Sequence, residues 1–143
     1  MENQNLKFDF VFLGQSVLKY QVPLDIFATI NQIYEQNFHN LAPANGQLVG
    51  KIENEHSLFY HGQDQSKMKN HNMLPTNVTN YFMTVFKHYL AFNKIRDYET
   101  HLNSVWVNEM KQHEYNPAHI HRGMLFTGLS SVMILKLPST YGK

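Results

Sequence analysis

Cysteine is absent from this chain of 143 residues. The absence excludes disulfide bonds, cysteine-ligated zinc and thiol catalysis, and it is typical of proteins in a reducing compartment. Long apolar runs are missing as well, because none approaches the ~20 residues of a membrane-spanning helix. The first residues, from Met1 to Asn5, are polar and lack the basic and apolar segments of a signal peptide. We therefore expect a cytoplasmic protein with no membrane partner.

A surplus of charge of either sign is also missing. The chain has 12 Lys and Arg against 11 Asp and Glu, which gives a net charge of +1. Nucleic-acid-binding domains usually carry a basic stripe or patch, so no nucleic-acid partner is predicted. Hydrophobic residues make up 43% of the chain and charged residues 16%, a composition that can build a folded core. The length matches one domain, and we expect a single domain over residues 1–143.

The N-terminal part predicts a hairpin followed by a helix. Aromatic residues at positions 8, 10 and 12 alternate with other residues, as in a strand. A turn at Gly14-Gln15 would return the chain into a second strand over residues 17–22. Pro23 then opens a helix that ends near Asn37. Its apolar residues fall on one face at helical spacing, and they are Ile26, Phe27, Ile30, Ile33 and Tyr34.

The middle of the chain predicts a loop and a second helix. Residues 53–73 are polar and rich in Asn, Gln, His and Lys, which favours a loop. Glu53 and Glu55 could face a functional site, but solvated residues of this loop are the preferred interpretation. Pro75 opens a longer helix that reaches Leu90, because apolar residues keep a 3.6-residue spacing over more than three turns.

The C-terminal part predicts strands. Ser104 to Met110 alternates, which places Asn108 on one face with Trp106, a residue interpreted as part of the core. Gly128 to Leu137 predicts a second strand, closed by a proline that cannot donate to a sheet. The fold class is therefore α+β, with a helical and mixed part over residues 1–103 and a sheet over residues 104–143.

Two histidines, His119 and His121, follow Asn116-Pro117. Residues two apart on a strand face the same way with alpha carbons ~6.5–7 Å apart, so two imidazoles can converge on one point. Such a pair can chelate a metal ion, whose bonds to nitrogen are ~2.0–2.1 Å long. The Asn-Pro step favours an extended entry into the pair. The pattern predicts a metal site, and ordinary surface histidines are the simpler alternative.

The histidine pair belongs to an ordered series of segments, namely Trp106-Val107-Asn108-Glu109-Met110, Glu114-Tyr115-Asn116-Pro117, His119-Ile120-His121 and Gly128 to Pro138. This series resembles the phage-type 2-oxoglutarate/Fe(II)-dependent oxygenases, a prolyl-4-hydroxylase-like family. Similarity to the same family extends to three N-terminal segments, which are Leu18 to Pro23, Leu48 to Glu53 and Leu74-Pro75.

The resemblance implies a fold and a chemistry. It implies N-terminal helices packed on a partial double-stranded β-helix, a jelly-roll or cupin-like sheet, whose first half is residues 104–143. It implies Fe(II) and 2-oxoglutarate as cofactors, with a small-molecule co-substrate and hydroxylation of a protein or small-molecule substrate. A phage-encoded member would act in the host cytoplasm.

The resemblance also implies the roles of two metal-site residues, and three further residues are candidates from their positions. His119 takes the place of the first metal ligand. His121 stands where the superfamily usually has a carboxylate, which would leave the metal site more positive. Asn108, Tyr115 and Arg122 are candidates for contacts with substrate or cofactor. No residue is assigned as catalytic.

The family continues beyond the position of Pro138 to a distal histidine and a basic residue that pairs with 2-oxoglutarate. No His or Arg follows Arg122 in this sequence. We therefore expect an incomplete oxygenase with little 2-oxoglutarate turnover, and its standing as an enzyme is left open. His113 is an alternative third ligand.

Two other functions stay open. The chain is alternatively a non-catalytic interaction or virion-associated module that retains the oxygenase scaffold. A zinc or nickel site between subunits is a third option. An incomplete sheet would expose an edge strand, and such edges pair with other chains. We therefore expect self-association or a partner chain at that edge.

Overall fold

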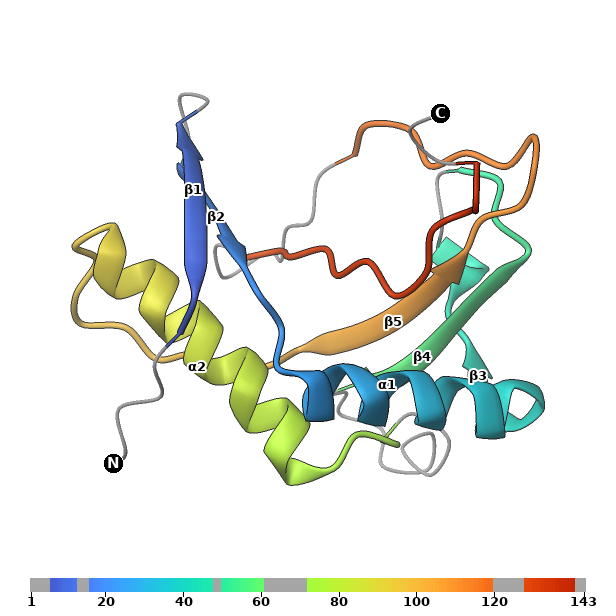
Figure 1. Ribbon diagram of the computed structural model, residues 1–143, viewed down its shortest axis with the longest axis horizontal. Coiled ribbons are helices and arrows are strands. Elements are labelled where there is room, and N and C mark those ends of the chain that lie inside the picture. Colours follow the sequence, from blue (N-terminus) through green and yellow to red (C-terminus); the bar gives the residue numbers. More distant parts are fainter. Residues whose placement is uncertain (1–5, 13–15, 48–49, 61–71, 120–127, 141–143) are drawn as a thin grey trace. The chain divides into compact units, whose positions relative to one another are not determined.

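The computed structural model describes residues 6–12, 16–47, 50–60, 72–119 and 128–140. Within these residues the fold is mixed α+β, with two α-helices and two small antiparallel sheets (Figure 1). The chain divides into two compact units, each built from two separate stretches. Unit 1 comprises Met1–Ile30 and Pro75–Leu102, and unit 2 comprises Asn31–Leu74 and Asn103–Lys143.

Unit 1 contains the predicted N-terminal hairpin. Strands β1 (Phe8–Phe12) and β2 (Ser16–Tyr20) pair antiparallel, with Phe10 opposite Leu18. Opposed residues in such a pair share a face, and every second residue along a strand lies on that face. The alternation of aromatic residues along β1 therefore gives the hairpin one aromatic face. The predicted pairing of the two strands is confirmed, and the predicted turn at Gly14-Gln15 lies outside the described residues.

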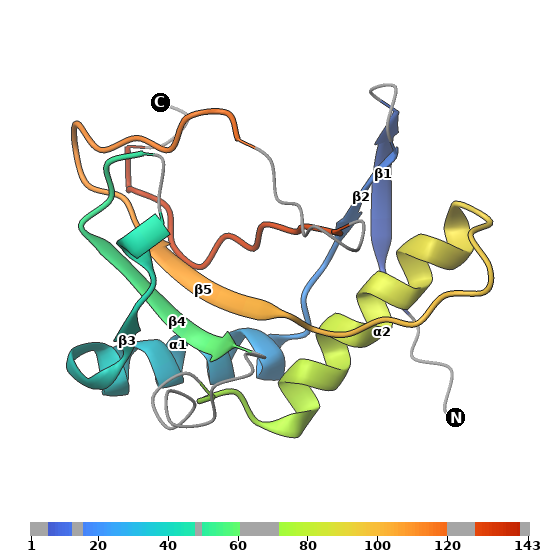
Figure 2. The ribbon, with the colours of Figure 1, turned by 180° about the vertical axis from the view of Figure 1, so that it is seen from behind.

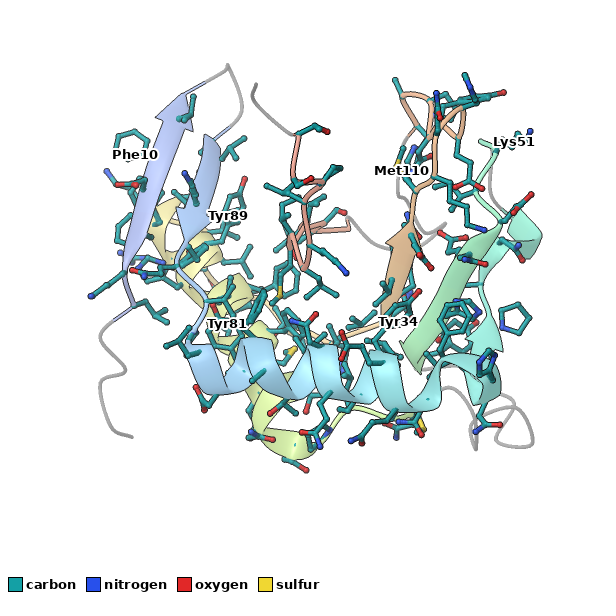
Figure 3. The ribbon with its side chains drawn as sticks, turned by 45° about the vertical axis from the view of Figure 1, so that its right-hand side comes forward. Phe10, Tyr34, Lys51, Tyr81, Tyr89 and Met110 are labelled. Carbon is teal, nitrogen blue, oxygen red and sulfur yellow. The ribbon has the colours of Figure 1, made fainter. Side chains whose placement is uncertain are left out.

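That aromatic face packs on α2 (Thr76–Phe92) within unit 1. The ring of Phe8 lies 4.9 Å from that of His88, and the ring of Phe10 lies 5.6 Å from that of Phe92. The hydroxyl of Tyr89 donates a hydrogen bond of 2.9 Å to the backbone oxygen of Ser16. Figure 3 shows Phe10 on β1 and Tyr89 on the helix. Aromatic contacts and hydrogen bonds together hold the hairpin against α2.

Both helices lie where the sequence predicts them. Helix α1 (Leu24–Asn37) follows Pro23 directly and buries Ile26 and Ile30 of the predicted apolar face. Helix α2 starts after Pro75, and it buries Val78, Tyr81 and Leu90. Neither of these helices, which are the two α-helices of the described residues, combines the length and apolar character needed to cross a bilayer.

Unit 2 is built around a three-stranded antiparallel sheet in the order β3-β4-β5 (Figure 2). Its strands are β3 (Ala42–Pro43), β4 (Asn54–Tyr60) and β5 (Ser104–Glu109). The last turns of α1 and two short 3-10 helices, η1 (Phe38–Asn40) and η2 (Asn45–Gln47), complete the described part before β4. Two buried apolar residues, Ile52 and Leu58, lie next to and within β4.

The predicted loop over residues 53–73 is wrong where β4 lies. The strand is stabilised by pairing with β3 on one side and β5 on the other, so its polar residues do not prevent its formation. Leu58, which is completely buried, is an extra residue where the register shifts between Ser57 and Phe59. Such a bulge also obscures the simple alternation by which a strand is recognised. Residues 61–71 lie outside the described part.

The predicted strand from Gly128 to Leu137 is also wrong. Residues 128–138 are irregular and join no sheet, as the red ribbon in Figure 1 shows. An apolar run can form a strand only where a neighbour provides a hydrogen-bonding edge. The described residues after position 103 therefore contain β5 as their single strand, and they form no jelly roll.

Candidate functional site

The paired strands β4 and β5 present two chemically different faces. Glu55 lies opposite Asn108, and these two side chains share one face of the sheet. His56 lies opposite Val107 on the other face. The neighbouring residues Glu55 and His56 of β4 therefore lie on opposite faces of the sheet.

The His56 face is covered by the end of α1. The ring of Phe38 lies 4.7 Å from the ring of His56, and the ring of Tyr34 lies 6.2 Å away. The Tyr34 hydroxyl donates to a Glu109 carboxylate oxygen at 3.5 Å, and Asn54 donates to the same oxygen at 2.9 Å. Burial lowers the pKa of His56, while the Glu109 carboxylate acts in the opposite direction. Figure 3 shows Tyr34 near these strands.

The Glu55 face carries buried polar groups. Glu55 is only 5% exposed, although the sequence favoured a solvated loop residue. The side-chain oxygen of Asn108 is buried and has no hydrogen-bond partner among the described residues. Burial raises the pKa of the Glu55 carboxyl, and the charge of His119 opposes this rise. We call Glu55 and its strand partner Asn108, together with His119, whose charge acts on the Glu55 carboxyl, the Glu55 site.

The segment before His119 is held against the segment before β4. The backbones of Lys51 and Tyr115 exchange two hydrogen bonds, of 2.9 and 3.1 Å. A Cβ added at Gly50 would collide with the carbonyl oxygen of Tyr115 and would lie 2.8 Å from Cδ of Pro117. Only glycine permits this close approach of two backbones. The contact fixes the course of the backbone that leads to His119.

A second set of contacts supports the same loop. The carboxylate of Glu114 accepts hydrogen bonds from the backbone amides of Glu53, at 2.9 Å, and Lys111, at 2.7 Å. These two bonds lower the pKa of Glu114, because they stabilise its charged form. Lys111 and Glu53 also form an ion pair of 3.3 Å. Figure 3 shows Met110 just beyond the end of β5, where this loop begins.

The hydrogen bond of His119 determines its tautomer. Its Nδ1 atom lies 2.7 Å from the carbonyl oxygen of Pro117. A carbonyl oxygen can only accept, so Nδ1 carries the hydrogen, and in the neutral ring Nε2 has the lone pair. Histidines that bind metals are usually held in this way, with one nitrogen donating to a carbonyl or carboxylate and the other binding the ion.

The structure brings together only some of the predicted site residues. His119 and Asn108 belong to the Glu55 site. Tyr115 contributes backbone hydrogen bonds with Lys51, and its side chain is 58% exposed. His121 and Arg122 lie outside the described residues.

Other predicted neighbours of the site are corrected or left outside it. Trp106 is 37% exposed, so its interpretation as a core residue is wrong, although it shares the Glu55 face as predicted. His113 is exposed in a turn with a φ of 68°. Within the described part of the chain, no group of three His, Cys, Asp or Glu residues is arranged to hold a metal ion.

Glu55 is the site residue that the sequence assigned to a solvated loop in preference to a site. All five residues between the apolar residues Ile52 and Leu58 are polar. No alternation with apolar residues indicated a strand there, so the stretch resembled a loop. Comparisons of this chain with models of protein families, with curated proteins and with solved structures found no match.

Proposed function

We propose that this chain binds a divalent iron ion through His119 and is related to the 2-oxoglutarate/Fe(II)-dependent oxygenases that hydroxylate a protein or small-molecule substrate, with the low 2-oxoglutarate turnover expected from its sequence. The observation that carries the proposal is the hydrogen bond from Nδ1 of His119 to Pro117, which leaves the lone pair on Nε2. The α+β fold is related to a jelly roll only through the resemblance of its sequence.

The residues of the Glu55 site fit such an ion. Imidazole nitrogen and carboxylate oxygen are the ligands of non-haem iron in oxygenases, and such sites keep open positions. The buried oxygen of Asn108 lacks a partner among the described residues, and a buried acceptor of this kind carries a cost of about 1–3 kcal/mol. A cation or a water molecule bound to it would satisfy this oxygen.

Iron and 2-oxoglutarate would supply the oxidation chemistry when bound, and the chain would supply positioning. His119 holds the metal, and the carbonyl of Pro117 fixes the orientation of its ring. The close contact of Gly50 with Tyr115 and Pro117 keeps this loop in place. His121 as a second ligand, and Tyr115 and Arg122 as co-substrate contacts, stay predictions from sequence.

Anaerobic calorimetry with Fe(II) tests the proposal. We expect one ion to bind per chain, and His119→Ala to abolish measurable binding. His101→Ala is the control, because it removes an exposed histidine of unit 1 that pairs with Glu99 at 3.3 Å. Equal iron binding by wild type and His119→Ala would contradict the proposal.

A second titration separates an oxygenase from another metal protein. 2-Oxoglutarate chelates the iron in this family, so each ligand should strengthen binding of the other by the same factor. We expect tighter Fe(II) binding in the presence of 2-oxoglutarate. Metal binding that 2-oxoglutarate leaves unchanged would instead support the zinc or nickel site.

One observation favours the interaction module as a second candidate function. The segment from residue 128 to 138 exposes apolar side chains, and Val132 is 87% exposed. Exposed apolar residues in one stretch are typical of binding surfaces. A chain that binds no metal and associates through this segment would match that candidate.

A further inference from the structure

The apolar segment, which we define as residues 128–137, runs without helical turns and belongs to no sheet (Figure 1). Its backbone makes no hydrogen bond to another described residue. Exposure nevertheless alternates along part of it, because Met133 and Leu135 are half-buried whereas their immediate neighbours are exposed. A period of two residues is the pattern of a β-strand. The segment therefore has the side-chain arrangement of a strand but lacks a hydrogen-bonded neighbour among the described residues.

The residue types of the apolar segment are nearly symmetric about Met133. The β-branched residues Val132 and Ile134 flank it directly, and Leu129 and Leu137 lie four residues away on either side. In a two-fold interface each residue of one copy meets a different residue of the other copy, and the reverse contact is identical. A segment that reads similarly in both directions is suited to such an interface, because it can meet a second copy of itself with matching side chains.

We propose that residues 129–137 of two copies of this chain pair as antiparallel strands, with Met133 on the two-fold axis. In this register Val132 lies opposite Ile134, and Leu129 lies opposite Leu137. Apolar and β-branched pairs across a ladder stabilise it. The proposal does not depend on iron binding, because it uses none of the residues of the Glu55 site.

The charge pattern of the segment fits a second copy in this orientation. Lys136 is the only charged residue between positions 128 and 140. In the antiparallel register it lies opposite Ser130, so the two lysines stay apart. Parallel pairing in register would instead place Lys136 of one chain beside Lys136 of the next, and opposed like charges destabilise a strand pair. The single lysine therefore permits the antiparallel dimer and disfavours parallel stacking.

Pairing would supply what the apolar segment lacks in one chain. Each copy would provide backbone donors and acceptors for the other, and a ladder satisfies such groups. Val132 is 87% exposed and Ile134 is 59% exposed, and each would gain an apolar neighbour across the pair. Pro138 follows directly, and because proline cannot donate a hydrogen bond to a sheet, it ends the proposed ladder.

The absence of cysteine makes the register measurable, because an introduced cysteine is the only thiol of the chain. Opposed residues of antiparallel strands have alpha carbons ~4.5–5.5 Å apart, which is within the ~4.4–6.8 Å of a disulfide. Met133→Cys in the full chain should therefore give a disulfide-linked dimer under mild oxidation. We expect this dimer to form at least about tenfold faster than in Ser130→Cys, the matched control, whose two thiols would lie ~20 Å apart along the strands.

A mixture of Ser130→Cys and Lys136→Cys chains tests the same register at positions away from Met133. These two positions oppose each other, so the mixture should form a disulfide-linked heterodimer at least about tenfold faster than either variant forms a homodimer. Mass spectrometry distinguishes the products. A mixture that crosslinks no faster than its components would overturn the proposed register, and so would equal crosslinking of Met133→Cys and Ser130→Cys.

Hydrogen exchange of the wild-type chain covers the case in which a cysteine variant does not fold. Backbone amides without hydrogen bonds exchange quickly, and pairing protects them. We expect exchange of residues 129–137 to slow by about tenfold or more between a dilute and a concentrated sample, with the amides of α2 as the reference. Exchange of this segment that is the same in both samples would overturn the proposal.

Discussion

At the scale of single residues, the absence of a side chain at Gly50 decides how His119 is positioned. Gly50 lies against the backbone of Tyr115 and the ring of Pro117, and any Cβ would collide there. Gly46 lies only four residues earlier, and a Cβ added to it would meet nothing within 4 Å. The two glycines therefore form a natural pair for comparison.

We predict that Gly50→Ala destabilises the chain and Gly46→Ala does not. Overpacking at a rigid contact costs about 1–3 kcal/mol, and the colliding atom here belongs to the backbone, so we expect about 2–3 kcal/mol for Gly50→Ala. Urea unfolding of both variants measures the difference. Equal stability of Gly50→Ala and Gly46→Ala would show that the two segments do not touch in solution.

Glu55 shows why the residues of the candidate site could be predicted only in part. The His119 motif could be recognised because it is short and continuous in sequence. The burial of Glu55 could not be recognised, because it depends on the pairing of β4 with β5, two strands about 50 residues apart. A glutamate between an asparagine and a histidine has no local feature that indicates burial.

At the scale of elements, the regular spacing of apolar residues predicted the helices and strands whose formation depends mainly on local sequence. The hairpin and both helices were predicted because their residues repeat at intervals of two or 3.6. Strand β4 was missed because its first four residues, Asn54 to Ser57, are all polar and its bulge at Leu58 disturbs the rest. The strand predicted over residues 128–137 is apolar but does not form, because apolar residues alone do not provide a neighbouring strand.

The cover that α1 provides for β4 leads to a prediction about pH. Burial lowers the pKa of His56 below its ordinary value of 6.5, and the Glu109 carboxylate only partly offsets this effect. The folded state therefore prefers neutral His56, and the unfolded state takes up the proton first as the pH falls. This contribution to stability is fully present above pH 6.5 and is lost between pH 6.5 and the lowered pKa.

We expect the free energy of unfolding to rise with pH across that window, and His56→Gln to reduce the slope. Urea unfolding of the wild type and the variant, from pH ~5 to pH ~8, measures the difference. Tyr34 and Phe38 face the same ring, so the variant should also be folded by circular dichroism. Parallel stability curves for the two proteins over this range would contradict the prediction.

At the scale of the whole molecule, association between chains is the expected property. The ladder of unit 2 ends in β5, and the described part of the chain provides no strand beyond it. The segment after it exposes Val132, Ile134 and Leu137. Open edges and exposed apolar residues both favour contact with other chains.

We predict that the purified chain self-associates at micromolar concentration, and that Val132→Lys shifts it toward monomer. Ser131→Lys is the control, because it adds the same charge at a neighbouring exposed position. Sedimentation velocity of the wild type and both variants measures the association. A monomeric wild type would exclude this segment as an association surface.

The pairing of Glu55 with Asn108 has a consequence for how the site is assembled during folding. The chain between these two residues includes all of α2, which belongs to unit 1. Ordering the site therefore requires closure of a long loop, and each doubling of such a loop adds about 0.6 kcal/mol of entropic cost. Contacts between distant residues also slow folding. The site is thus a late and non-local product of the fold, because Glu55 and Asn108 come together only when β4 pairs with β5.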